Sequence, residues 1–96
     1  MDGNRTTKTV KPNTVIRLKA FRLGFMDQRE GRPLRELGPD FPIVNGLCPQ
    51  SAYEKGRLVA TFEPRLTLDD VTPKYGKVSG FALRSFYAAH ASGAIP

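Results

Sequence analysis

Nine basic side chains in the first third of the chain are the residues best suited to chemistry with a partner. Residues 1–35 carry these nine lysines and arginines against three acids, a net charge of +6, while residues 36–96 carry six of each sign. The whole excess charge therefore lies in residues 1–35. This asymmetry favours a polyanionic partner, either nucleic acid or an acidic protein surface, although a net charge of this size also keeps small domains soluble.

Six of these cations are the predicted contacts to nucleic acid. Arginine presents a planar fork that matches phosphate and also stacks on unpaired bases, so the excess of arginine over lysine favours RNA. A helix face in contact with solvent alone would produce the same pattern, and both interpretations stay open. The six predicted nucleic-acid-binding residues are Arg17, Lys19, Arg22, Arg29, Arg32 and Arg35.

The sequence contains no motif for catalysis or for a bound cofactor. Walker-type loops, Gly-x-Gly-x-x-Gly and Gly-x-Ser-x-Gly are all missing. One cysteine and one histidine cannot assemble a zinc site without several carboxylates, and one cysteine cannot form an internal disulfide. We therefore expect no enzyme, no cofactor and no metal. Cys48 is predicted to be structural, His90 to be partly exposed, and Asp69-Asp70 to form a turn or a helix cap.

Membrane association and export are not expected. The longest apolar runs are only a few residues, too short to span a bilayer. The polar segment Met1–Lys11 lacks the apolar core of a signal peptide. We predict a cytoplasmic protein with no membrane partner, and its oligomeric state stays open.

Short helices joined by long connections must position the basic residues. Residues 1–12 are polar and lack periodicity, which predicts a flexible basic arm, and residues 13–96 are predicted to form one small helical domain. Apolar residues at helical spacing predict a first helix over residues 15–30, capped by Asn13 or Thr14.

A long loop over residues 31–47, rich in glycine and proline, leads to the second predicted helix. This helix spans about residues 48–62, and two start signals compete for it. Pro49 is suited to the first helical position, whereas Ser51 with Glu54 matches a capping box.

Small residues predict close contact between these two helices. Gly24 lies inside the first helix, where glycine costs up to about 1 kcal/mol relative to alanine, so another backbone is expected to approach there. The second helix carries Ala52, Gly56 and Ala60 on one side, with Tyr53 beside them.

The last third of the chain completes the predicted fold. Within residues 63–78, residues 65–68 indicate a short strand or an extended segment, and Asp69-Asp70 with Pro73 indicate a turn. Ser79 is predicted to cap a third helix over residues 80–91. The fold class is predicted to be mainly α, a small helix-loop-helix core with a third C-terminal helix and long loops.

Two segments between residues 17 and 62 carry an ordered set of motifs. The first segment contains Ala20-x-x-x-Gly24-Phe25 followed by Gly31-Arg32, and the second contains Cys48-Pro49 followed by Tyr53-x-x-Gly56-x-x-x-Ala60. This set resembles the ribosome modulation factor family. Here the loop before Cys-Pro is longer, the gap after it is shorter, and a tyrosine stands where the family tends to have tryptophan. Structural roles are predicted for Gly24, Phe25, Gly31, Cys48, Pro49, Tyr53 and Gly56.

The resemblance implies a helix-loop-helix core that binds the ribosome or ribosomal RNA. Together with the charge, it predicts a small, basic, non-catalytic protein that binds through its basic N-terminal helix and modulates translation. The alternative is a phage- or plasmid-borne adaptor or inhibitor that docks on a host nucleoprotein machine, with residues 31–47 and 63–78 as its partner surface. A helix-turn-helix DNA binder ranks third, because the loop between the first two helices is too long.

Overall fold

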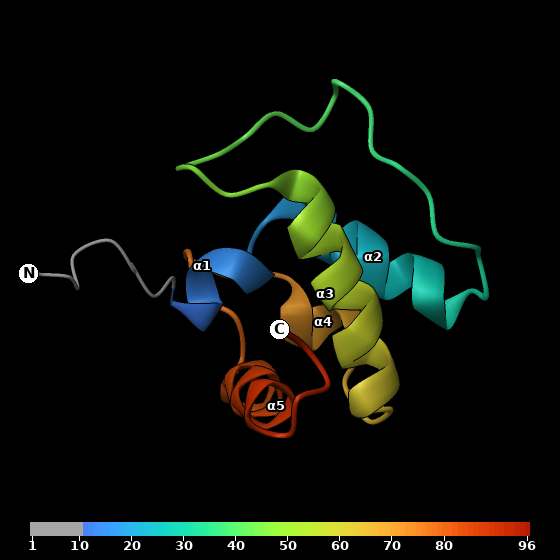
Figure 1. Ribbon diagram of the computed structural model, residues 1–96. Helices are drawn as coiled ribbons and strands as arrows, with labels where there is room; N and C mark the ends of the chain where they lie inside the picture. Colours follow the sequence, from blue (N-terminus) through green and yellow to red (C-terminus); the bar gives the residue numbers. More distant parts are fainter. Residues whose placement is uncertain (1–10) are drawn as a thin grey trace, which may run out of the picture.

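The computed structural model describes residues 11–96, which form five helices (Figure 1). These are α1 (Pro12–Ile16), α2 (Lys19–Arg29), α3 (Pro49–Phe62), α4 (Leu68–Val71) and α5 (Gly80–Ala91). The only β pairing within this range consists of two isolated bridges, Val44 with Leu47 and Lys74 with Lys77. The predicted mainly α fold is confirmed, with a helix-loop-helix core, a third C-terminal helix and long loops.

Helices α2 and α3 make the most extensive helix contact of the fold and cross in Figure 1. Two glycines permit this crossing. A Cβ atom on Gly24 would overlap the carbonyl oxygen of Tyr53, and a Cβ atom on Gly56 would overlap that of Phe21. The two backbones can approach so closely only because these positions carry no side chain. The predicted close contact is confirmed.

A single apolar core receives side chains from all five helices. Phe21 and Phe25 of α2 and Tyr53 of α3 are buried in it. The ring of Phe21 lies 6.2 Å from that of Phe86 on α5. After α5 the chain folds back, and Ile95 is also buried. The last third of the chain therefore belongs to the same core as the helix-loop-helix pair.

The first helix is interrupted at Leu18, and the prediction of one helix over residues 15–30 was wrong. Leu18 is extended, with φ −68° and ψ 141°, so α1 ends before it and α2 begins after it. Apolar spacing continues across the break because the buried side chains of both helices enter the same core. The change of direction at Leu18 lets α1 contact α5.

Helix α1 begins earlier than predicted. Pro12 is its first residue and is buried, and no side chain caps the helix start at Lys11. The predicted cap residue Asn13 instead accepts a hydrogen bond from Val78 N at 3.0 Å and donates one to Gly76 O at 3.0 Å. Of the predicted arm, residues 1–10 lie outside the described residues.

The later helices start largely as the sequence predicts. Cys48 is the N-cap residue of α3 and Pro49 its first residue, so the proline signal decides that start. Ser51 accepts a hydrogen bond from Lys55 Nζ at 2.8 Å. Ser79 caps α5 by accepting a hydrogen bond from Ala82 N at 3.0 Å, which confirms its predicted role.

The short helix α4 was not predicted. Its start is a capping box in which Thr67 Oγ1 accepts from Asp70 N at 3.2 Å and Asp70 Oδ2 accepts from Thr67 N at 2.9 Å. The Thr-x-x-Asp spacing was an available signal in the sequence.

No helix within residues 11–96 has the length and apolar composition needed to cross a bilayer.

Candidate nucleic-acid interface

The six predicted nucleic-acid contacts lie at opposite ends of α2. Those at the start of the helix are Arg17, Lys19 and Arg22, and those at or beyond its end are Arg29, Arg32 and Arg35. The two groups differ in what their guanidinium and ammonium groups already contact. This difference separates the cations that already pair with a carboxylate or with carbonyls at the end of α3 from those that do not.

Arg29 binds the end of α3 and the segment after it. Its Nη1 donates to Leu66 O at 2.6 Å, and its Nη2 donates to Ala60 O at 3.3 Å and Glu63 O at 3.0 Å. The last carbonyls of a helix lack partners inside that helix, and a cation satisfies them well. The guanidinium also lies 4.4 Å from the ring centroid of Phe25. Its donors are therefore largely occupied within the fold.

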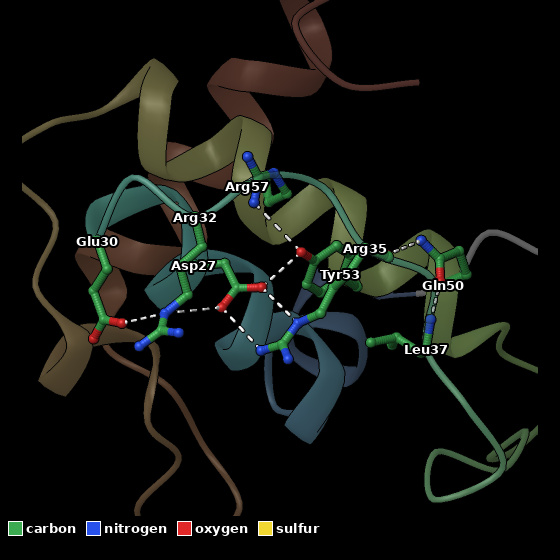
Figure 2. A network of polar contacts seen from close by, with 8 residues as sticks. All are labelled: Asp27, Glu30, Arg32, Arg35, Leu37, Gln50, Tyr53 and Arg57. Atoms are coloured by element: carbon green, nitrogen blue, oxygen red, sulfur yellow. Dashed lines mark hydrogen bonds and ion pairs between the residues drawn. The ribbon is translucent and has the colours of Figure 1, made fainter.

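Asp27, a buried carboxylate, organises the end of α2 (Figure 2). Tyr53 Oη donates to Asp27 Oδ2 at 2.7 Å, and Arg35 donates to both carboxylate oxygens, from Nε at 2.9 Å and from Nη2 at 3.0 Å. Arg32 Nε lies 4.0 Å from Asp27 and donates to Glu30 at 2.8 Å. Arg35 and Arg32 thus hold the loop after α2 against its last turn.

Burial and hydrogen bonding act on Asp27 in opposite directions. Burial by itself would raise the pKa of this carboxyl, because the charged form loses its hydration. The hydrogen bonds from Tyr53 and Arg35 and the charges of Arg35 and Arg32 outweigh burial, so the pKa of Asp27 is lowered from its ordinary value. The hydrogen bond to Asp27 in turn raises the pKa of Arg35.

Asp27 was not predicted from the sequence to have a role in this region. By charge alone it is one of three acids in residues 1–35, beside nine basic residues. The available signal was its position three residues after Gly24, which places it on the buried side of α2. An acid there requires partners, and Tyr53 supplies one from the facing helix.

Gln50 on α3 attaches the start of the long loop (Figure 2). Its Oε1 accepts from Leu37 N at 2.8 Å, and its Nε2 donates to Arg35 O at 3.0 Å. The same Nε2 also donates to Glu54 at 3.1 Å. Gly31, the predicted helix stop, has φ +74°, a conformation that favours glycine after the last turn of a helix. The first part of the 31–47 loop is therefore bound to both α2 and α3.

The cations at the α1–α2 junction have a different environment. Arg17 and Lys19 are exposed and Arg22 is half-buried. Arg22 Nη1 donates to Arg17 O at 3.0 Å, and burial lowers the pKa of Arg22 from its ordinary value. Within residues 11–96 none of the three pairs with a carboxylate. A partly desolvated cation in this state gains from an anionic partner.

A distant turn adds a fourth cation to this junction. The turn over residues 74–77 is held against α1 by the two hydrogen bonds of Asn13 described above. Arg17 Nη1 lies 3.8 Å from the point where a Cβ atom on Gly76 would lie. The backbone of Lys77, between Gly76 and Val78, therefore lies close to the start of the basic region, about sixty residues away in sequence. We call Arg17, Lys19, Arg22 and Lys77 the junction cations.

The remaining candidate residues show no clustering for chemistry. Cys48 is an exposed free thiol whose side chain makes no capping bond. His90 is exposed on α5. Asp70 caps α4 and Asp69 pairs with Lys74 at 2.9 Å, in keeping with the predicted turn or cap role. In the described part of the chain no three potential metal ligands come together.

A comparison of this chain with family models, with curated proteins and with solved structures finds no match.

Proposed function

We propose that this protein binds RNA through the junction cations, that its target is ribosomal RNA or the ribosome, and that it modulates translation without catalysing a reaction. The observation that carries the proposal is the gathering of four cations at the α1–α2 junction. None of the four pairs with a carboxylate in the described range. The proposal implies a cytoplasmic location.

The chemistry of these cations supports RNA over other anions. Two of the four are arginines, which contact phosphate through a planar fork and also stack on unpaired bases. The resemblance of residues 17–62 to the ribosome modulation factor family supports the ribosome as the source of that RNA. Arg29 and Arg35 contribute to the fold of the binding region and are weaker candidates for direct contact, because their donors face carbonyls and Asp27.

The test is the salt dependence of RNA binding by a charge-removal variant. Arg17→Gln/Lys19→Gln/Arg22→Gln removes three of the junction cations. Each phosphate contact on a single strand contributes about 0.7 to the slope of log K against log salt, so the slope should fall by about 2. Fluorescence anisotropy with a labelled ribosomal RNA fragment measures the slope, and co-sedimentation with ribosomes tests the target.

The matched control is Lys55→Gln/Arg65→Gln/Arg84→Gln, which removes the same charge elsewhere. These three residues lie on α3, after α3 and on α5. The control should keep most of the slope, because only unspecific attraction is reduced. Equal slopes for the two variants, or salt-independent binding by the unmodified protein, would contradict the proposal.

A second candidate function, docking on a protein, is favoured by the far part of the long loop. Ile43 is 71% exposed, and beneath the loop lies an apolar cavity of about 210 Å³. Its apolar lining comes from Leu18, Ala20, Phe41, Pro42, Val44, Leu47 and Pro49. Capture of one protein complex from nuclease-treated lysate, abolished by Ile43→Asp and kept in the junction variant, would favour this function.

A further inference from the structure

The turn over residues 74–77 carries a tyrosine that neither the fold nor the proposed contacts explain. Lys74 and Lys77 pair through two backbone hydrogen bonds, at 2.8 and 3.1 Å. Between them Tyr75 has φ +53° and Gly76 has φ +78°. Positive φ at both central residues is typical of type I′ turns, which favour Asn-Gly and Gly-Gly.

A second turn in the same molecule shows what this geometry ordinarily selects. Between Val44 and Leu47 the central residues are Asn45 and Gly46, with φ +52° and +76°. Asparagine tolerates left-handed backbone conformation well, whereas a bulky side chain such as tyrosine is disfavoured there. Tyr75 therefore occupies its position against the local conformational preference.

Packing does not explain Tyr75 either. Its relative exposure of 106% means that its ring contacts essentially nothing in the fold. Every other aromatic residue of the described range is more buried, including Tyr87 at 60%. An aromatic ring that is disfavoured by its backbone and unsupported by packing is expected to serve a partner.

The turn is nevertheless rigidly held, so the ring has a defined position. The side chain of Asn13 forms hydrogen bonds on both sides of Lys77, the last residue of the turn: one with Gly76 O and one with Val78 N. Val78 is buried, and the next residue, Ser79, donates its backbone N–H to Asp70 O at 3.1 Å. The turn follows α4 in the chain and lies beside α1 (Figure 1). A ring presented in this way loses little entropy when it binds.

The surroundings of the ring are cationic. Lys74 and Lys77 flank it in the chain, and the guanidinium of Arg17 lies close to Gly76. Lys74 pairs with Asp69, whereas Lys77 in the turn and Arg17 beside it have no carboxylate partner within the described range. One exposed aromatic plane next to two available cations matches the way proteins bind single-stranded RNA, with a stacked base and contacts to its neighbouring phosphates.

We propose that Tyr75 stacks on an unpaired base of a single-stranded RNA segment while Lys77 and Arg17 contact the adjoining phosphates. The inference rests on the proposed RNA-binding function. It adds that the bound RNA segment is unpaired and that Tyr75 is the residue that contacts its base. A base inside a duplex is already stacked on both faces, so a paired segment gains nothing from the tyrosine.

The test compares Tyr75→Asn and Tyr75→Phe with Tyr87→Gln as the control for loss of an exposed tyrosine. Tyr75→Asn creates the Asn-Gly pair that the turn prefers, so the variant should fold with an equal or higher melting temperature. Its affinity for a short labelled oligouridylate should fall by about 5- to 150-fold, the range expected for loss of one stacked base. Tyr75→Phe and Tyr87→Gln should bind within about twofold of the unmodified protein.

Tyrosine fluorescence provides a second readout, since the chain has no tryptophan. Oligouridylate should quench the emission of the unmodified protein by stacking on Tyr75. Tyr75→Phe should bind equally well without that quenching. The inference is supported if Tyr75→Asn loses both the affinity for oligouridylate and the quenching. The affinity of the same variant for duplex RNA of equal length should not change.

Three results would overturn it, and they differ in what else they affect. If the unmodified protein binds no RNA, the proposed function fails as well. If it binds RNA but Tyr75→Asn binds equally tightly, only the stacking role fails. If Tyr75→Asn weakens binding to an acidic peptide and leaves RNA binding unchanged, the turn serves an acidic protein partner instead.

Discussion

Replacing Gly24 or Gly56 by alanine tests the physical basis of the α2–α3 crossing. In an ordinary exposed helix position this change stabilises the protein by up to about 1 kcal/mol, because alanine has the higher helix propensity. At these two positions the added methyl group would overlap a backbone carbonyl of the facing helix. A carbonyl oxygen within a helix cannot rotate away as a flexible side chain can, so the helices themselves must separate.

The expected cost follows from what that separation disturbs. A gap of only about 0.5–1 Å forfeits a quarter to a half of the dispersion attraction between two packed surfaces. Phe21, Phe25 and Tyr53 are all buried along this contact. Overpacking a core ordinarily costs about 1–3 kcal/mol, and a blocking atom in the backbone belongs at the upper end. We expect each variant to lose roughly 2–3 kcal/mol after the propensity gain, a large part of the roughly 5–14 kcal/mol available to a chain of this size.

Urea and thermal denaturation, followed by circular dichroism, measure this loss. The melting temperature should fall by roughly 10–25 °C, since a domain of this size shifts by about 4–8 °C per kcal/mol. Gly80→Ala is the matched control, because its Cβ atom would meet only the movable guanidinium of Arg84. It should melt at the same or a slightly higher temperature.

The double variant sharpens the test. Both added methyl groups force apart the same pair of helices, so the second should cost less once the first is present, and the two effects should not add. The reasoning would be refuted if Gly24→Ala or Gly56→Ala melted at or above the temperature of the unmodified protein. Full additivity in the double variant would show that the two glycines act at independent contacts.

Two further stability predictions concern charged groups at the end of α2. Because Asp27 has a lowered pKa in the folded state, its stabilising effect is present above the unfolded pKa of about 3.9 and is lost as the pH falls through the lower folded value. Asp27→Asn should therefore lower the free energy of unfolding by roughly 2 kcal/mol at pH 7, and by progressively less on acidification. The prediction would be contradicted if the difference in urea midpoint between the variant and the unmodified protein did not shrink below about pH 4. Arg29→Gln removes three hydrogen bonds to carbonyls and should cost roughly 1.5–3 kcal/mol, with faster amide exchange in the last turn of α3. Unchanged amide protection there would show that Arg29 does not hold that helix end.

Local signals in the sequence predicted most of the helices but not the break at Leu18. Pro49 and Ser79 mark their helix starts through backbone chemistry that operates within a few residues. At Leu18 no proline or glycine interrupts the chain, and the apolar spacing continues. The break depends instead on contacts of α1 with α5 and with the turn over residues 74–77, which a local pattern does not contain.

The sequence did not predict that the six cations divide into one group at the start of α2 and another at its end. All six cations share one stretch of chain and one residue chemistry, so charge counting treats them alike. Arg29 differs from Arg22 only because the end of α3 lies against it. Arg35 differs because Asp27, a buried acid, lies beside it. These differences arise from burial and from partners that come together only in the folded chain.

The sequence by itself determined the helical class, the excess charge of the first third and the close glycine contact of two helices. These follow from propensities, caps and small residues, whose effects are local or depend only on periodicity. The tertiary structure alone decided which cations bond carbonyls and carboxylates within the fold, that Asp27 is buried among its partners, and that the turn carrying Tyr75 and Lys77 lies beside α1. The physical reason is that contacts between residues as far apart as Asn13 and Val78 form through packing and hydrogen bonding across the core, and no spacing rule connects them.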